Sequence, residues 1–124
     1  LTNRPPTKGP VAYRQSVPGG DAFQPDLAAA TTDLERLVRR LRSLSQRSWR
    51  ERRAAAQAAL DGLAALDARL EGRQLDTPTV PEHALADALA VIGGDVLDAI
   101  AMLDDRSALD TTIHLLEVAL ERTR

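Results

Sequence analysis

The chain has 124 residues, enough for one domain, and its 44% hydrophobic content can supply a core. With one Phe, one Trp and one Tyr, that core must consist mainly of Leu and Ala, and the absence of cysteine excludes disulfides and thiolate metal sites. The net charge of −2 hides an asymmetry, because residues 1–60 carry 11 basic and 5 acidic side chains whereas residues 61–124 carry 5 and 13. The halves can pair by folding back on one another, or each can dock an oppositely charged partner.

Residues 1–25 are rich in proline and glycine, which is typical of an extended arm. Proline fixes its own backbone and lacks a donor, so a long helix or central strand does not fit here. Tyr13 and Phe23 are the large aromatic side chains of this segment. We expect them to contact a partner subunit; the alternative is a disordered tail.

Residues 26–71 predict a long amphipathic helix. Their apolar side chains fall within one arc of about 100° when each residue is turned by the helical angle. The residues of this arc are Leu27, Leu34, Leu37, Leu41, Leu44, Ala55, Ala59, Leu63, Leu66 and Leu70. Ser45 and Ser48 interrupt the arc, and Ser48 with Glu51 fits a capping box. We favour one continuous helix with a possible break at 45–48; the alternative is two helices joined by a tight turn.

Two shorter helices are expected after Gly72, which suits the position just past a helix. Thr79 and Pro81 predict the start of a helix over about 80–103. Within it, Gly93 and Gly94 indicate a kink or a close approach of another backbone. Ser107 with Asp110 predicts a cap for a last helix over about 108–122.

The predicted lengths favour a chain that folds back on itself, because the first helix would be about 69 Å long and the other two about 36 and 22 Å. The third helix would then cover residues 48–71 and the fourth would lie along 27–47. Such a hairpin leaves apolar edges exposed, so we expect a dimer that completes a four-helix bundle. The expected interface residues are Leu34, Leu41, Trp49, Leu63, Leu66, Leu70, Leu85, Leu89, Ile92, Val96, Ile113 and Leu116.

An arginine-rich stretch is the strongest chemical signal of the chain, with eight arginines between residues 36 and 53. Arg36, Arg40, Arg47 and Arg50 fall opposite the apolar arc, where they can bind an anionic partner. That partner is either nucleic acid, whose phosphates arginine neutralises, or an acidic protein surface. Asp110, Glu117 and Glu121 of the same chain could also approach this stretch. We favour protein, because no base-reading motif accompanies the arginines.

No catalytic, cofactor-binding or metal site is expected. His83 with Asp87 and His114 with Glu117 have spacings that place two ligands on one helical face, but such spacings are common in helices. Gly93-Gly94 lacks the context of a phosphate-binding loop. We therefore expect a protein that is not an enzyme.

The fold class expected is all-α, with an arm over 1–25 and a helical bundle domain over 26–124. The function expected is that of a non-catalytic helical scaffold, adaptor or assembly subunit, acting through self-association and partner binding by the arm. The alternative is a nucleic-acid-associated protein that uses the arginine face. The sequence has no membrane span and no export signal at its start, so we expect a cytoplasmic location.

Overall fold

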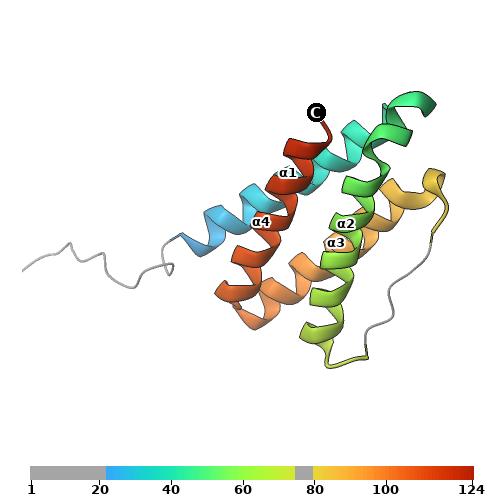
Figure 1. Cartoon of the computed structure of the whole chain (residues 1–124). Helices are drawn as coiled ribbons and strands as arrows, with labels where there is room; N and C mark the ends of the chain where they lie inside the picture. Colours follow the sequence, from blue (N-terminus) through green and yellow to red (C-terminus); the bar gives the residue numbers. More distant parts are fainter. Residues whose placement is uncertain (1–21, 75–79) are drawn as a thin grey trace, which may run out of the picture.

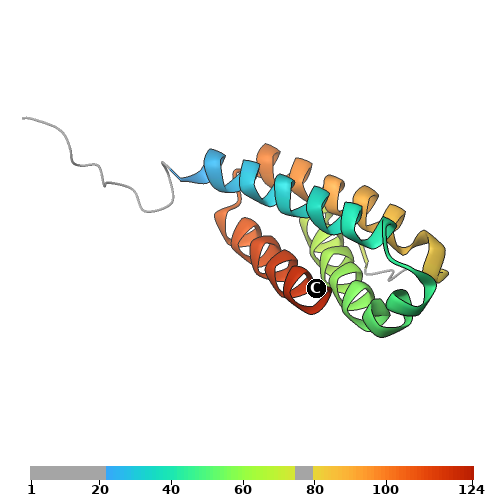
Figure 2. The same cartoon turned by 90° about the horizontal axis from the view of Figure 1, so that it is seen from above.

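The computed structural model describes residues 22–74 and 80–124, which form a bundle of four α-helices (Figure 1). The helices are α1 (Phe23–Arg42), α2 (Gln46–Glu71), α3 (Leu85–Leu103) and α4 (Arg106–Arg122), with a single 3₁₀ turn, η1 (Glu82–Ala84), before α3. The two views show antiparallel helices α1 and α3 in one layer, crossing a second layer of antiparallel helices α2 and α4 (Figures 1 and 2). The expected all-α class is confirmed.

The prediction of one continuous helix over 26–71 is wrong, because α1 ends at Arg42 and a new helix begins at Gln46. Ser45 has an extended backbone, and its hydroxyl accepts a hydrogen bond from the Ser48 amide at 3.2 Å. A serine at this position satisfies a backbone N–H that the first turn of a helix cannot pair. The cap is therefore Ser45 and not Ser48, and the two-helix alternative holds.

The arm was expected to reach residue 25, but α1 already begins at Phe23. Pro25 lies in the first helical turn, where its missing N–H would have no helical partner in any case. Phe23 is 6% exposed and belongs to the bundle core, so its assignment as an arm contact is wrong. Tyr13 and the rest of the expected arm, residues 1–21, lie outside the described residues.

Among the other helix ends, the end of α2 is as expected, whereas the starts of α3 and α4 differ from the prediction. Gly72 closes α2 with a left-handed backbone, φ 67°, as expected. Thr79 lies outside the described residues, and α3 proper begins at Leu85 after η1. The cap of α4 is Asp105, whose carboxylate accepts from the Ala108 amide at 3.0 Å, and not Ser107 as the sequence predicted.

The core lies between the two layers, where α1 and α2 each pack against both α3 and α4. The expected placement of α3 on α2 and of α4 along α1 is confirmed. Because α1 and α2 are separate helices, α1 also packs on α3 and α2 also packs on α4. The fully buried large side chains come from all four helices. They include Leu37, Leu41, Leu60, Leu63, Leu85, Leu89, Ile100, Leu109 and Leu116.

This packing changes what the expected dimer interface residues do. Eight of them are buried inside a single chain, namely Leu34, Leu41, Leu63, Leu66, Leu85, Leu89, Val96 and Leu116. The other four, Trp49, Leu70, Ile92 and Ile113, are half-buried against the same core. These twelve side chains therefore contact the core of a single chain, because the described residues of that chain supply four helices. Self-association must therefore be argued from another surface.

Candidate functional site

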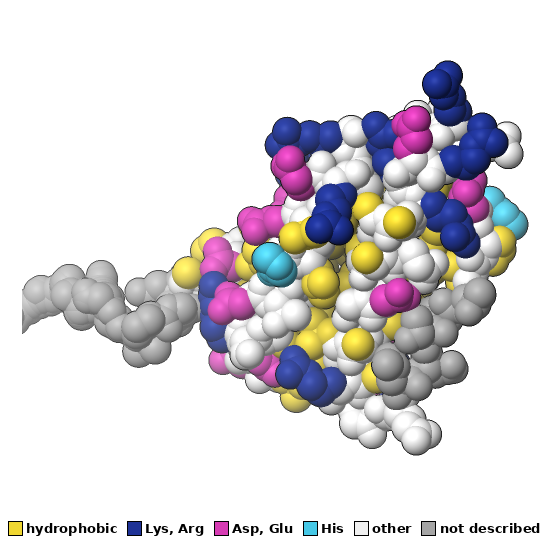
Figure 3. All heavy atoms as spheres, viewed as in Figure 1, with side chains coloured by type: hydrophobic (Ala, Val, Ile, Leu, Met, Phe, Trp, Pro, Cys, Tyr) yellow, Lys and Arg dark blue, Asp and Glu magenta, His cyan; other side chains and the backbone are white. Residues whose placement is uncertain are grey.

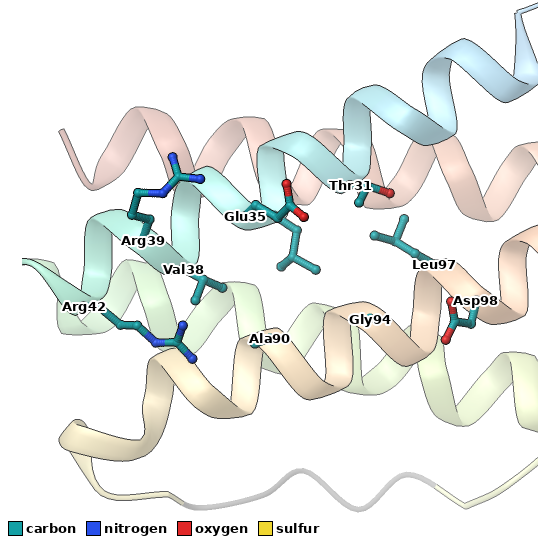
Figure 4. A pocket seen from close by; sticks show the side chains of 10 residues that line it. Thr31, Glu35, Val38, Arg39, Arg42, Ala90, Gly94, Leu97 and Asp98 are labelled. Carbon is teal, nitrogen blue, oxygen red and sulfur yellow. The ribbon is translucent and has the colours of Figure 1, made fainter.

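An open groove runs between α1 and α3 on the outer side of their layer, with a volume of about 670 Å³ (Figure 4). Figure 4 shows residues of both helices facing the groove. Its lining consists of Thr31, Leu34, Glu35, Val38, Arg39, Arg42, Ala90, Gly94, Leu97 and Asp98.

The floor of the groove is apolar because α1 and α3 come close together there. Leu34, Val38 and Leu97 line it, and each is 6% exposed. At Gly93 a Cβ atom would lie 2.8 Å from the Leu34 side chain, so the absence of a side chain permits this approach. Gly94 faces open space and lines the groove. The glycine pair thus marks the close approach of a neighbouring side chain within a helix that runs unbroken from Leu85 to Leu103.

The rim of the groove is charged. Arg42 of α1 pairs with Asp87 of α3 at 2.6 Å across one end. Glu35, Arg39 and Asp98 are exposed, and within 22–74 and 80–124 none of them forms an ion pair. These three charged side chains therefore border the apolar floor of the groove without an ion-pair partner among the described residues.

The arginines expected to bind an anionic partner are divided by the fold. Arg36 pairs with Asp33 at 2.9 Å. Arg40 is half-buried and donates to the Leu120 carbonyl at 2.7 Å, near the carboxyl end of α4. A cation suits this position because the last carbonyls of a helix lack helical partners. Arg47 and Arg50 are exposed on α2.

The acidic side chains of α4 only partly meet the arginine-rich stretch. Glu117 and Glu121 line a small hollow together with Arg36 and Arg40. Asp110 instead pairs with Arg106 at 2.9 Å, and Arg106 also reaches Asp26 at 2.7 Å. Figure 3 shows basic side chains gathered at the end of the bundle where α1 and α4 finish and α2 starts. Of the eight arginines in this stretch, Arg40 and Arg52 hydrogen-bond the carboxyl end of α4 and the residues that follow it, and the other six are exposed.

Asp67 is a buried acid that sequence reasoning missed. It is 4% exposed on α2, and one carboxylate oxygen accepts from Arg73 at 2.6 Å while the other has no partner. Burial raises the pKa of Asp67, the nearby Glu71 and Asp95 raise it further, and Arg73 opposes them. Residue type alone does not single out this acid, because Asp61 on the same helix is also an aspartate and is exposed.

Neither histidine belongs to a group of potential metal ligands among the described residues. His83 and His114 are both exposed. Among residues 22–74 and 80–124, no group of three or more His, Asp or Glu side chains is placed to hold a metal ion. No helix of this described part has the length and apolar character needed to cross a bilayer.

The groove itself was not predicted, although the sequence carries a signal for it. Ala90, Gly94 and Leu97 follow one another at helical spacing along a side of α3 outside its main apolar stripe. Small residues on that side leave the hollow that α1 borders. The chain matches no protein-family model, no curated protein and no solved structure.

Proposed function

We propose that this protein is a non-catalytic helical scaffold, adaptor or assembly subunit that acts through protein–protein contacts. The observation that carries the proposal is the α1–α3 groove, whose lining combines the apolar side chains of Leu34, Val38 and Leu97 with charged side chains that have no ion-pair partner among the described residues. Grooves between two helices are a recurring docking place for a further helix, which buries apolar side chains on the floor and pairs charges at the rim.

Exposed apolar side chains on α3 support the same proposal. Val91 is 63% exposed and Met102 is 86% exposed. They are eleven positions apart, which is about three helical turns, so both point to one side of α3. Apolar groups next to a groove add area that a docking protein can cover.

The alternative function, binding to nucleic acid, would use Arg47 and Arg50. Arg36 and Arg40 are engaged with Asp33 and the end of α4, so two of the four arginines expected to contact phosphates remain. Two phosphate contacts give a slope of about −2 in a plot of log affinity against log salt. This is a weak basis for a nucleic-acid protein, and we place it second.

The experiment measures the mass of the purified full chain by sedimentation equilibrium at micromolar concentration, alone and with duplex or single-stranded DNA. We expect a mass of at least twice 13.4 kDa without DNA and no DNA binding at physiological salt. Arg47→Glu with Arg50→Glu should leave the mass unchanged, and so should the control Arg69→Glu elsewhere on α2.

Two results would reject this order of functions. A monomeric mass at all concentrations up to the millimolar range would remove self-association from the proposal. Salt-sensitive binding to DNA of any sequence, lost in the Arg47→Glu, Arg50→Glu variant and kept in the Arg69→Glu control, would favour the nucleic-acid function.

A further inference from the structure

A further hollow, of about 120 Å³, lies between α2 and α4, in the other layer from the α1–α3 groove. All but two of its lining residues are apolar. The apolar ones, three from each helix, are Ala55, Ala58, Ala59, Leu115, Val118 and Ala119. Figure 3 shows the molecule from the side of α2 and α4, with apolar side chains between these helices. A small apolar hollow of this kind suits one aliphatic side chain of a partner.

The apolar lining of this α2–α4 hollow is accessible from outside. Ala58 is exposed, and Ala55, Leu115 and Val118 are half-buried. Leu115 lies against α2 at Gly62, where an added Cβ atom would be 2.7 Å from it. The two walls of the hollow are therefore held in place by packing within the chain.

Three exposed arginines without an ion-pair partner belong to the same surface. Arg122 of α4 lines the hollow, and Arg47 and Arg50 lie nearer the start of α2. None of the three forms an ion pair among residues 22–74 and 80–124. Arg50, Ala54 and Ala58 are four positions apart, so they follow one another along one side of α2. The arginines and the hollow are therefore continuous.

Contacts within the chain do not account for this positive charge. Arg47 is the second residue of α2, where the positive end of the helix dipole disfavours a cation. The nearby acids have other neighbours, because Glu51 pairs with Arg52, and Glu117 and Glu121 border the hollow on the α1 side of α4. The described part of the chain therefore leaves the α2–α4 surface positively charged.

We propose that the α2–α4 surface docks an acidic segment of a partner protein. This inference rests on the proposed function and names the chemistry of a partner. An aliphatic side chain of the segment enters the hollow, and neighbouring carboxylates of the segment pair with Arg47, Arg50 and Arg122. Arginine can form two parallel hydrogen bonds to a carboxylate, which makes such a pairing directional as well as electrostatic.

The choice of an acidic protein segment over nucleic acid follows from the hollow. Phosphates neutralise arginines too, but a sugar–phosphate backbone has no aliphatic side chain to place between α2 and α4. Sequence-tolerant binding of single strands also uses aromatic side chains on which bases stack. Among residues 22–74 and 80–124 the aromatic residues are Phe23, which is buried, and Trp49, which is half-buried against the core.

The hollow is tested with two synthetic peptides, a run of glutamates with leucine at its centre and the same run with serine in place of leucine. Isothermal titration calorimetry measures their affinities for the full chain. We expect the leucine peptide to bind at least about fivefold more tightly, because burying leucine removes apolar surface from water. Ala58→Gln should abolish this preference by filling the hollow. The control Ala65→Gln, also exposed on α2 but outside the hollow, should keep it.

The arginines are tested with the same peptides. Arg50→Glu and Arg122→Glu should each weaken the binding of both peptides by at least about fivefold, because each variant places a negative charge opposite the glutamates. Both variants should keep the preference for leucine, since the apolar walls of the hollow are unchanged. The control Arg69→Glu, near the end of α2, should bind both peptides within about twofold of the wild type.

The contrary outcomes separate this inference from the proposed function. Equal affinities for the two peptides would show binding by charge alone and contradict a role for the hollow. Tighter binding of single-stranded DNA than of the leucine peptide would favour nucleic acid as the occupant. No binding of either peptide at millimolar concentration rejects the surface, while self-association, measured by sedimentation without peptide, can still hold.

Discussion

A single hydroxyl group sets the point at which the first two helices separate. The Ser45 side chain accepts from the Ser48 amide, and the Ser45 backbone leaves the helical region with φ −67° and ψ 162°. Ser48 contributes its backbone N–H to this cap, which any residue other than proline provides. The two serines therefore have unequal roles although they stand only three residues apart.

Ser45→Ala should lower the free energy of unfolding by about 1 kcal/mol, because it removes the cap of α2. Ser48→Ala is the matched control and should change stability by less than about 0.5 kcal/mol, since it keeps the amide donor. Urea denaturation followed by circular dichroism measures both. Equal losses in the two variants, or a larger loss in Ser48→Ala, would show that Ser45 is not the cap.

Asp67 couples stability to pH in the direction opposite to most acids. Burial raises its pKa above 3.8, so the folded chain holds this proton more tightly than the unfolded chain does. Between pH 3.8 and the raised pKa, the free energy of unfolding therefore falls as the pH rises. The contribution of Asp67 is most favourable below that window, where both states are protonated.

Asp67→Asn removes this titration. We expect the stability of the variant relative to the wild type to increase as the pH rises through the window and to level off above it. Urea denaturation at a series of pH values gives this difference directly. A difference that stays constant, or that falls with rising pH, would contradict the raised pKa.

At the scale of elements, the apolar periods predicted α3 and α4 within a few residues. The apolar stripe of α3, which includes Leu85, Leu89 and Val96, is followed by a polar residue, Asp104, at the helix end. In the structure Asp104 has a left-handed backbone with φ 54°. The break between α1 and α2 was predicted only as the alternative to one continuous helix, because the apolar positions on its two sides kept the same phase. The angular phase of an apolar stripe does not show whether the chain turns back. The turn depends on the Ser45 cap, a local hydrogen bond that competes with continuation of the helix.

The groove could not be predicted from periodicity, because it depends on how α1 and α3 are paired. Arg39 and Asp98 are 59 positions apart, and nothing in the sequence indicates that their helices lie side by side. The sequence did indicate that Gly93-Gly94 has a packing role. It did not distinguish the two glycines, of which one faces Leu34 and the other faces open space.

This difference between neighbouring glycines gives a matched pair of variants. Gly93→Ala and Gly94→Ala gain the same helix propensity, up to about 1 kcal/mol. Only the Gly93 methyl group meets Leu34, so Gly93→Ala should be less stable than Gly94→Ala by about 1–2 kcal/mol. Thermal or urea denaturation measures the difference. Equal stabilities would mean that α1 and α3 are not packed at this point.

At the scale of the whole molecule, the opposite charges of the two halves meet inside one chain. Arg42 pairs with Asp87 at 2.6 Å, and Arg53 approaches Glu82 at 3.9 Å. These side chains are partly exposed, and pairs of this kind contribute about 0–1 kcal/mol each. Such ion pairs are therefore a minor contribution, and the buried leucines of all four helices supply most of the stability.

The central claim is that one chain closes its own core by turning back between α1 and α2. The most direct test is the distance between spin labels at Ala28→Cys on α1 and Arg69→Cys on α2, measured by pulsed electron resonance. Both positions are exposed, the chain has no other cysteine, and unlabelled protein in excess removes distances between copies. The folded-back bundle predicts a distance well below about 40 Å, since α2 starts at the end of the bundle where α1 finishes and turns back from there. A distance of about 60 Å, the length of a continuous helix over these 41 positions, would contradict the fold and everything built on it.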